Sequence, residues 1–468
     1  MTSRESFIPR QGTATVHEQL REGNKAARSL QPPMIWSFMP FKGIRYNTAV
    51  VGDIARVVAP PYDVISPEQR DQLSAKHPCN IVHLELGKDQ PGDTGRENRY
   101  TRAGTAFFKW AGDRCLTEDA APAFYVYDQQ FRLGLRTFTR RAFFAAVRLE
   151  PFGSRVLPHE ETMPGPRADR LRLITACPVN LSPIFGLYRD PDNSVPELLA
   201  SALPATPEVS FEDFDGIKQA LWKIDDPQVQ ARLSELMETK RIYIADGHHR
   251  YETALRYRDL AVEAQGKLDS ADARNFVMIA CVSIADPGLV ILPAHRVIGG
   301  IAGFELGRLL EKLAPYFDVA PVNARGRSGI VDTLLGTMAG KQHAFGLYSG
   351  GTAHTITLRN EADADANPAL HTQAWKRLDV SMLVWLILEH GLGLKHDDLS
   401  NPEHVTYVKD AADAAALVDA GQYQVACYLN PTRVDQLEEV AQAGERMPPK
   451  STYFYPKLLT GLVMRRLV

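Results

Sequence analysis

The strongest constraint in this sequence is a strand–turn–helix unit written RIYIADGHHRYETALRYRDLAVEAQ. The apolar run IYIA predicts a buried strand, Asp246-Gly247 predicts a turn, and a helix is expected from His248 onward. A glycine in the turn lets the backbone approach a ligand, and the first turn of a helix offers free N–H groups at its positive end. Together with His248, His249 and Arg250, this unit predicts a site for a phosphate or carboxylate group. The alternative is a solvated first turn capped by Asp246, but cations at a helix start oppose its dipole.

Strand and helix patterns alternate through the rest of the chain and predict an α/β fold built on mixed sheets. Near the start we expect strands at residues 34–46, 56–60, 80–86, 123–131 and 141–149, the last of which also suits a helix. RENRYTRAGTAFFKWAG and VQARLSELMETK have the apolar spacing of amphipathic helices, while IKQALWKI suits a strand or a short helix. Beyond residue 300, FELGRLLEKLAPYF and SMLVWLILEHGL predict helices, and HAFGLYSG, HTITLRN, HVTYVK and QVACYL predict strands.

The length and the net charge of the chain constrain its domain number and the kinds of partner it can bind. The 468 residues suggest a loosely attached arm at 1–33, a domain at 34–299 and a C-terminal α/β domain at 300–468 that closes over the site. Lys plus Arg is 53 and Asp plus Glu is 56, a formal charge of −3 that disfavours a nucleic-acid binder. We find no membrane-spanning run, no signal peptide and no CxxC pair, so we expect a cytoplasmic protein with reduced thiols and no membrane partner. The sequence leaves the oligomeric state open.

The stretch VLPHEETMPGPRADRLRL places carboxylates beside guanidinium groups. Its candidate metal ligands are His159, Glu160 and Glu161, and its candidate phosphate-binding residues are Arg167 and Arg170. Such a mixture could hold a divalent cation beside a phosphate, as phosphoryl transfer requires. The spacing is not HExxH, so a helical zinc-protease site is unsupported. A charged surface loop is the competing interpretation.

Other polar residues interrupt apolar stretches elsewhere. Asp63 lies in the rigid connection RVVAPPYDVISPEQ, just before a helix start marked by Ser66-Pro67. In such a connection Asp63 is either a ligand-binding group or a residue that caps the turn. Substrate-binding candidates are Asn180 and Ser182 in NLSPIFGLY and His295 and Arg296 in ILPAHRVI, although a lone histidine in such a strand is more often a core residue.

The C-terminal stretch RMPPKSTYFYPKLLTGL crowds basic and hydroxyl groups around aromatic residues. Lys450, Ser451, Thr452 and Lys457 could fold back over an anionic ligand, or they could belong to a docked tail with surface lysines. The sequence has no GxxxxGK[ST] loop, no GxGxxG after a strand and no GxSxG elbow.

Six of these motifs in order resemble a bacterial family called domain of unknown function 1015. They are PPYDVIS, HEET with PRADRL, NLSPIFGLY, DGHHRYETA, LPAHR and MPPKSTYFYPK, and the resemblance runs from about Met34 to the C-terminus. DGHHR also resembles the Gly-x-x-Arg phosphate-binding turn of the superfamily that contains ParB, sulfiredoxin and an archaeal kinase of free serine. This resemblance implies a ParB/sulfiredoxin-like core at 34–299 with a large insertion, and it places Gly247, His248, His249 and Arg250 at the phosphates. Members of the family are often encoded beside serine-biosynthesis genes, an association that favours a serine or phosphoserine substrate.

We therefore expect a phosphotransferase that uses a nucleotide or pyrophosphate with Mg²⁺ or another divalent cation. Serine or a related small hydroxylated molecule is the expected acceptor. Asp63 or Glu160 would bind the metal or take the hydroxyl proton, His248 would act as acid, base or phosphate donor, and Lys450 and Lys457 would neutralise charge in the transition state. A kinase and a phosphatase would share nearly all these groups.

Two other classes stay open at this stage. One is a ParB-like binding protein switched by a nucleotide, which the acidic balance and the lack of a helix-turn-helix disfavour. The other is a zinc hydrolase built on His159, Glu160, His248 and His249, which lacks diagnostic ligand spacing.

Overall fold

A computed structural model describes residues 36–160, 164–395, 398–399 and 401–468. The expected arm at 1–33 and the candidate ligand Glu161 lie outside these residues. Residues Ser37–Val468 form one unit, and the division into domains at 299/300 stays a prediction.

The site is built on a nine-stranded mixed sheet whose strand order is β6-β11-β8-β12-β5-β4-β10-β9, with β1 beside β5. Two pairs, β11–β6 and β12–β8, are parallel, whereas β11–β8 and β12–β5 are antiparallel. The predicted α/β class with a mixed sheet is therefore confirmed. The strands are β1 (Phe38–Met39), β4 (Phe124–Leu133), β5 (Arg136–Arg148), β6 (Val156–Leu157), β8 (Ile184–Tyr188), β9 (Val209–Glu212), β10 (Lys218–Ile224), β11 (Ile242–Asp246) and β12 (Phe276–Ser283).

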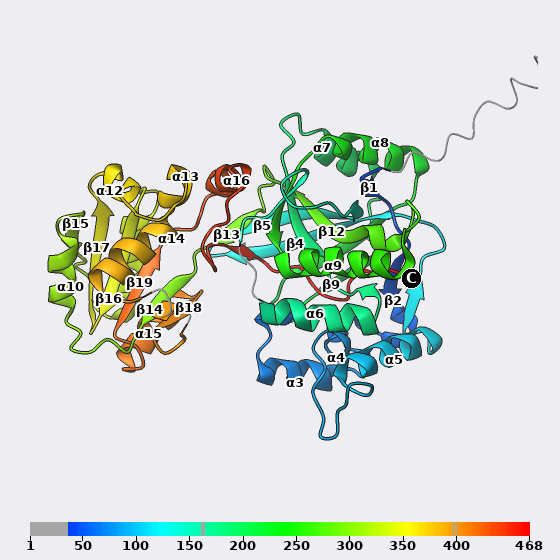
Figure 1. The fold of residues 1–468 in the computed structure, drawn as a ribbon, viewed down its shortest axis with the longest axis horizontal. Coiled ribbons are helices and arrows are strands. Elements are labelled where there is room, and N and C mark those ends of the chain that lie inside the picture. The colour runs from blue at the N-terminus through cyan, green and yellow to red at the C-terminus, as the bar shows by residue number, and fades with distance from the viewer. Residues whose placement is uncertain (1–35, 161–163, 396–397, 400) are drawn as a thin grey trace, which may run out of the picture. The chain divides into compact units, whose positions relative to one another are not determined.

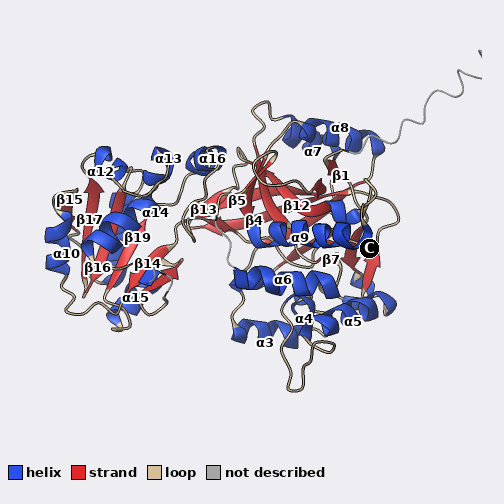
Figure 2. Ribbon diagram, viewed as in Figure 1, coloured by secondary structure: helices blue, strands red, loops and turns tan. Residues whose placement is uncertain are grey.

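Helices pack on this sheet and bury a common apolar core. Figure 2 shows strands of the sheet between α9 (His248–Gln265) and the pair α7 (Ser194–Ala202) and α8 (Pro227–Glu238). Tyr251 of α9 and Leu233 of α8 are fully buried members of this one core. In Figure 1, α6 (Pro164–Ala176) lies beside α9, and the helices α3 (Pro67–Lys76), α4 (Val82–Glu85) and α5 (Arg99–Gly112) follow beyond it.

Three smaller sheets complete the described fold. A six-stranded sheet has the order β15-β17-β16-β19-β14-β18, a four-stranded sheet the order β3-β2-β21-β7, and β13 pairs with β20. The last strand of the chain, β21, thus pairs with a strand from near the start of the described residues. The strands are β2 (Gly43–Tyr46), β3 (Leu116–Glu118), β7 (Val179–Asn180), β13 (Val290–Leu292), β14 (His295–Ile298), β15 (Phe317–Pro321), β16 (Ala344–Ser349), β17 (Thr352–Leu358), β18 (Val405–Val408), β19 (Val425–Leu429), β20 (Tyr453–Tyr455) and β21 (Met464–Arg466).

The remaining helices are mostly short. They are α2 (Thr48–Val51), η1 (Ile54–Arg56), η2 (Tyr62–Val64), η3 (Ala273–Asn275), α10 (Leu306–Leu313), α11 (Arg327–Met338), α12 (Glu361–Asp365), α13 (Gln373–Lys376), α14 (Asp379–Met382), η4 (Leu383–Gly391), α15 (Ala411–Asp419) and α16 (Val434–Gln442). The helix predicted from SMLVWLILEHGL is confirmed, and most of it has π-helical hydrogen bonding.

Most predicted elements are confirmed, including both parts of the strand–turn–helix unit and the helix that Ser66 caps. Residues 141–149 and IKQALWKI are strands. Two predictions are wrong. Residues 80–86 contain helix α4 instead of a strand, because the buried Asn80 accepts a hydrogen bond from the Val82 N–H and donates to the Arg56 and Val58 carbonyls. Residues 56–60 follow a 3₁₀ turn and make only an isolated bridge, from Ala59 to Thr460.

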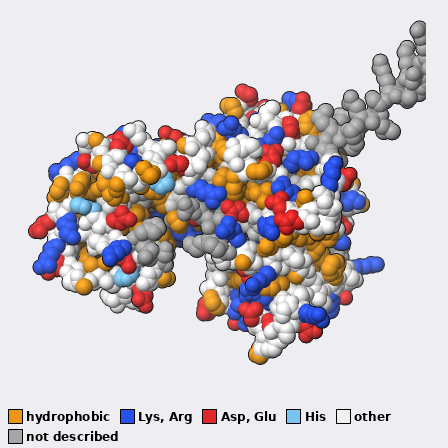
Figure 3. All heavy atoms as spheres, in the orientation of Figure 1, with side chains coloured by type: hydrophobic (Ala, Val, Ile, Leu, Met, Phe, Trp, Pro, Cys, Tyr) orange, Lys and Arg blue, Asp and Glu red, His pale blue; other side chains and the backbone are white. Residues whose placement is uncertain are grey.

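Three whole-chain expectations can be compared with the described residues. The five cysteines are free and buried. None of the helices in the described part of the chain combines the length and apolar content that a bilayer crossing requires. Over the face drawn in Figure 3, Lys and Arg side chains lie among Asp and Glu side chains, in keeping with the near-neutral formal charge.

Candidate functional site

The turn between β11 and α9 has the backbone conformation that glycine favours. Gly247 has φ +95° and ψ 28°, in the left-handed region, and serves as the N-cap of α9. A Cβ atom at this position would lie 3.0 Å from the Nε atom of Arg250. The helix has no side-chain cap, so Asp246 is not the cap that the alternative interpretation requires. The N-cap residue thus supplies no side-chain acceptor to the first turn of α9, and backbone N–H groups at such a helix start can bind an anion.

Asp246 instead forms an ion pair with a lysine from the far end of the sequence. The Lys457 Nζ atom lies 3.2 Å from Asp246 Oδ2, and the Arg250 Nη2 atom lies 3.7 Å from the same oxygen. Burial alone would raise the pKa of Asp246, but the Lys457 and Arg250 cations hold it well below its usual range. Two fixed cations thus lie together at the turn, an arrangement that suits an anionic ligand.

A buried polar pair fixes the position of Lys457. Gln129 Nε2 donates to the Lys457 carbonyl at 3.1 Å, and Arg140 donates to the carbonyls of Tyr455 at 3.3 Å and Pro456 at 2.6 Å. Gln129 and Arg140, on β4 and β5, are each 1% exposed and hydrogen-bonded to each other. The C-terminal segment is thus attached to the central sheet immediately beside the site.

Two histidines form a neutral pair behind the turn. His159 Nδ1 lies 2.5 Å from the Ile244 carbonyl, which can only accept, so this nitrogen carries the proton and Nε2 accepts from the Thr452 hydroxyl at 2.9 Å. His248 Nε2 accepts from the His159 backbone N–H at 3.2 Å. Burial lowers the pKa of His159 to about 4 and, reinforced by His159, lowers the pKa of His248 well below its usual value. Both rings are therefore neutral at pH 7.

Glu160 is held at the site by the C-terminal segment. The Lys450 N–H donates to Glu160 Oε1 at 3.1 Å, and the Met447 N–H donates to the His159 carbonyl at 2.6 Å. Lys450 adopts a left-handed backbone with φ +58°, which is uncommon for a residue with a side chain. Burial raises the pKa of Glu160, and the Asp246 charge adds to this although the Lys450 N–H opposes it. A carboxylate with a raised pKa is suited to accept a proton.

A cavity of about 50 Å³ adjoins the turn. Its polar lining comprises Glu85, Arg170, Asn180, Ser182, Arg250 and Thr253. Arg250 belongs to both places, because its Nη1 atom donates to Ser182 Oγ at 3.1 Å while Nη2 faces Asp246.

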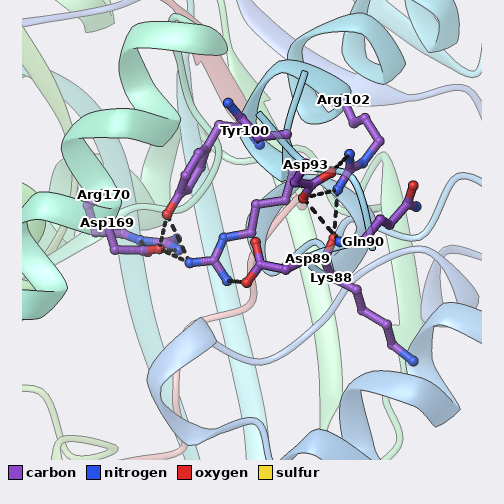
Figure 4. Close-up of polar contacts among 10 residues, drawn as sticks. Lys88, Asp89, Gln90, Asp93, Tyr100, Arg102, Asp169 and Arg170 are labelled. Atoms are coloured by element: carbon purple, nitrogen blue, oxygen red, sulfur yellow. Dashed lines mark hydrogen bonds and ion pairs between the residues drawn. The ribbon is translucent and has the colours of Figure 1, made fainter. Parts of the chain in front are cut away.

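Arg170 is fixed in the cavity wall by several partners. Its Nη1 atom donates to the Glu85 carbonyl at 3.0 Å and to Glu85 Oε1 at 3.1 Å, and its Nε atom donates to Asp169. Figure 4 shows Tyr100 pointing at Asp169, to which its hydroxyl donates at 2.7 Å. Arg170 is thus a buried structural cation with its donors largely occupied.

Three predicted site residues have described contacts with residues other than Asp246 and Gly247. Arg167 is exposed and pairs with Glu252 of α9 at 3.2 Å, and its charge helps to lower the pKa of His249. His295 is 2% exposed in β14, where its Nδ1 atom accepts from the Leu429 N–H at 3.4 Å. Arg296, also buried, donates to the Lys450 carbonyl at 3.4 Å and so supports the C-terminal segment from behind.

Three more of these residues lie close to the turn or in its support. The Ser451 hydroxyl donates to the Pro448 carbonyl, an internal contact of the C-terminal segment. Asp63 is exposed on η2, and its charge partly offsets the lowering of the His249 pKa by burial. The Asp63 carboxylate therefore lies close enough to the His249 ring to affect its pKa.

The residues at the turn can be compared with the ligand sets of zinc and magnesium sites. Among the described residues, no group of three or more His, Cys, Asp or Glu side chains is arranged to hold a metal. Both ring nitrogens of His159 are hydrogen-bonded, so this ring does not offer a free ligand. Mg²⁺ commonly takes one or two carboxylates and completes its shell with phosphate and water oxygens, and Glu160 and Asp246 can supply such carboxylates.

Sequence reasoning did not find Glu85 and Thr253. Glu85 was hidden in a stretch that resembled a strand, and Thr253 in the amphipathic pattern of α9. The helical spacing of Thr253 from Arg250, three residues along, was the available signal, because residues i and i+3 share a helix face.

Among solved structures, the chain is similar to a conserved hypothetical protein from Pyrococcus furiosus at 13% identity, covering 68% of this chain and 92% of that chain with a TM-score of 0.32. It is also similar to a free serine kinase in complex with AMP at 12% identity, covering 67% and 86% with a TM-score of 0.32. SbnI with a C-terminal truncation, from Staphylococcus aureus, gives 13% identity, 68% and 85% coverage and a TM-score of 0.32. At these scores no individual residue is assigned by equivalence.

No curated protein matches the sequence significantly. A family model described as "Protein of unknown function (DUF1015)" matches residues 38–381. The match ends before the segment that carries Lys450 and Lys457. Because it covers well over half of the 468 residues, the chain belongs to the DUF1015 family of proteins of unknown function.

Proposed function

We propose that this protein is a phosphotransferase that binds the phosphate groups of a nucleotide or pyrophosphate at the start of α9 and transfers one to a small hydroxylated acceptor, serine being the first candidate. The observation that carries the proposal is the Asp246-Gly247 turn, where Lys457 and Arg250 converge on one carboxylate beside an uncapped helix start. Backbone N–H groups at a helix start and fixed cations at one point are what a phosphoryl group in transfer requires.

Each residue of the turn has a role in this proposal. The N–H groups of the first turn of α9, Arg250 and Lys457 bind the donor phosphates and stabilise the charge of the transition state. Glu160 takes the proton of the acceptor hydroxyl as its oxygen attacks the phosphorus and the bond to the leaving phosphate oxygen breaks. His248 has the supporting role of fixing the His159 backbone, because its Nε2 atom already accepts a hydrogen bond.

A divalent cation fits this arrangement as a companion of the donor. When bound, it would neutralise phosphate charge, and Asp246 is the carboxylate that would hold it, since Glu160 takes the acceptor's proton. Asp63 and His249 lie near each other beside the turn, where they would contact the donor.

The test is a binding and turnover measurement on two variants of one helix. Purified protein is titrated with ATP, ADP, CTP and pyrophosphate, with and without magnesium, and phosphate transfer to serine is followed by the appearance of phosphoserine. Arg250→Ala removes a cation from the turn, whereas the matched control Arg256→Ala removes an exposed arginine of the same helix, which pairs with Glu263 at 2.7 Å. We expect at least about a tenfold loss of donor affinity in the first variant and no change in the second.

Equal donor affinity in Arg250→Ala and the parent protein would contradict the proposal. Binding of none of the four phosphate compounds would contradict it as well. Conversion of phosphoserine to serine, without the forward reaction, would keep the site and change the direction of the chemistry to a phosphatase.

A further inference from the structure

In the proposed function the donor phosphates bind at the turn, and Arg250 is the residue of the adjoining cavity that also contacts them. A single water requires roughly 10–15 Å³, so a cavity of about 50 Å³ has room for about four waters or a molecule as small as the smallest amino acids. A nucleotide does not fit within it. Leu173, Ile174, Val179 and Ile184 supply apolar walls between the polar groups.

One hydroxyl in the cavity lacks a partner. Thr253 is 4% exposed, lines the cavity, and its Oγ1 atom is buried without a hydrogen bond among the described residues. Burying a hydroxyl without a partner is costly, and such groups are rare in folded proteins. The hydroxyl is satisfied if a polar molecule occupies the cavity.

The charged groups in the wall are of both signs. Glu85, 4% exposed, shares the Arg170 cation with Asp169, so its negative charge is only partly compensated. Arg250 donates from Nη1 to Ser182 Oγ and to the Pro183 carbonyl, and its Nη2 atom faces Asp246, so the guanidinium is a fixed positive charge in the wall. The wall thus offers an acceptor for a cation and a donor for an anion.

From these contacts we infer that the cavity is the acceptor subsite of the proposed transferase, and that it takes a small zwitterionic amino acid. The ammonium group lies against Glu85, the carboxylate is bound by the Arg250 guanidinium and the Asn180 amide nitrogen, and Thr253 gains a hydrogen bond. This assignment rests on the proposed function, and it adds the class of acceptor and the residues that recognise it. Arg250, shared by turn and cavity, would bring the acceptor next to the donor phosphate.

The first test uses ligands that each lack one group. The full-length protein is titrated calorimetrically with L-serine, with glycerate, which lacks the ammonium group, and with ethanolamine, which lacks the carboxylate. We expect each truncated compound to bind at least about tenfold more weakly than L-serine, because each leaves a buried charge of the wall unpaired. Glycerate binding as tightly as L-serine would overturn the zwitterion assignment.

The second test uses variants that separate binding from folding. Thr253→Val keeps the shape and removes the unpartnered hydroxyl, so we expect an unchanged or higher melting temperature together with about fivefold weaker L-serine binding. Glu85→Gln is expected to weaken L-serine binding at least about tenfold. Thr175→Val, at an exposed position of α6, is the matched control and should bind as the parent does. Unchanged L-serine affinity in Thr253→Val would overturn the inference.

Pyrophosphate binding, measured in parallel, distinguishes the two proposals. One outcome is that Arg250→Ala weakens pyrophosphate binding while Thr253→Val leaves the affinity for L-serine unchanged. In that case the cavity assignment is wrong and the phosphate site is supported. If L-serine binds in a Thr253-dependent way but no phosphate compound binds, the cavity stands as an amino-acid site and the transferase proposal fails. If the cavity holds only ordered water, none of the three small ligands binds and the inference is wrong.

Discussion

The ion pair between Lys457 and Asp246 gives a prediction that can be worked out in detail. Replacing Lys457 by Met keeps the aliphatic stem and removes the ammonium group, which lies 3.2 Å from Asp246 Oδ2. At an effective dielectric constant of about 20, two unit charges at this distance attract by about 5 kcal/mol. The two side chains are 14% and 20% exposed, so most of this is offset by the cost of removing the lysine from water, and Arg250 remains as a second partner. We expect Lys457→Met to lower the free energy of unfolding by about 2 kcal/mol at pH 7.

The pH dependence of the stability difference between parent and Lys457→Met tests whether the ion pair causes that difference. In the folded protein the pKa of Asp246 is held below its ordinary value of 3.8, so the stabilisation is present above pH 4 and is lost as pH falls further and the carboxyl takes up its proton. The difference between parent and variant should therefore be full at pH 5 and 7 and shrink toward pH 3. Urea unfolding at these pH values measures it, with Lys267→Met at an exposed position as the control.

The same variant should bind pyrophosphate at least about tenfold more weakly, because a charge-assisted contact is removed. A stability difference that does not change between pH 7 and pH 3 would refute the ion-pair reasoning. Unchanged pyrophosphate affinity would show that Lys457 has only a structural role.

Two further predictions concern the backbone and the histidines of the site. Gly247→Ala should lower the free energy of unfolding by about 1–2 kcal/mol and weaken pyrophosphate binding, because φ is +95° and the new Cβ atom would lie 3.0 Å from Arg250 Nε. The control is Gly266→Ala, at the other end of α9, where φ is +79° and, among the described residues, no atom beyond the chain neighbours lies within 4 Å of the new Cβ. It should lower stability in urea unfolding without affecting pyrophosphate binding. The pKa of buried His159 is lowered to about 4, so between pH 6.5 and pH 4 only the unfolded chain takes up a proton at this residue. The free energy of unfolding should therefore fall by up to about 3 kcal/mol as pH decreases through this range. In His159→Gln the urea midpoint should depend less on pH between these values. If the midpoint of the variant falls as steeply with pH as that of the parent, other groups cause the loss of stability.

Local patterns in the sequence determined the site's central unit. The run IYIA followed by Asp246-Gly247 is a strand and turn for reasons contained in those residues, since apolar β-type side chains precede a glycine that alone tolerates φ +95°. The helix after Ser66-Pro67 was equally predictable, because cap and N1 preferences act over four residues. Arg250 was predicted as a site residue from its place in the first turn.

Tertiary structure decided what surrounds that unit. Lys457 reaches Asp246 across 211 residues of sequence, because buried Arg140 and Gln129 bind the backbone just before and at Lys457, and no local pattern encodes that contact. Likewise, Asn80 makes its long-range hydrogen bonds to the backbone near Arg56 and turns a strand-like sequence into helix α4, which delivers Glu85 to the cavity. Short-range preferences fix a turn or a cap, whereas the partners of a buried charge are set by chain segments that only the folded core brings together.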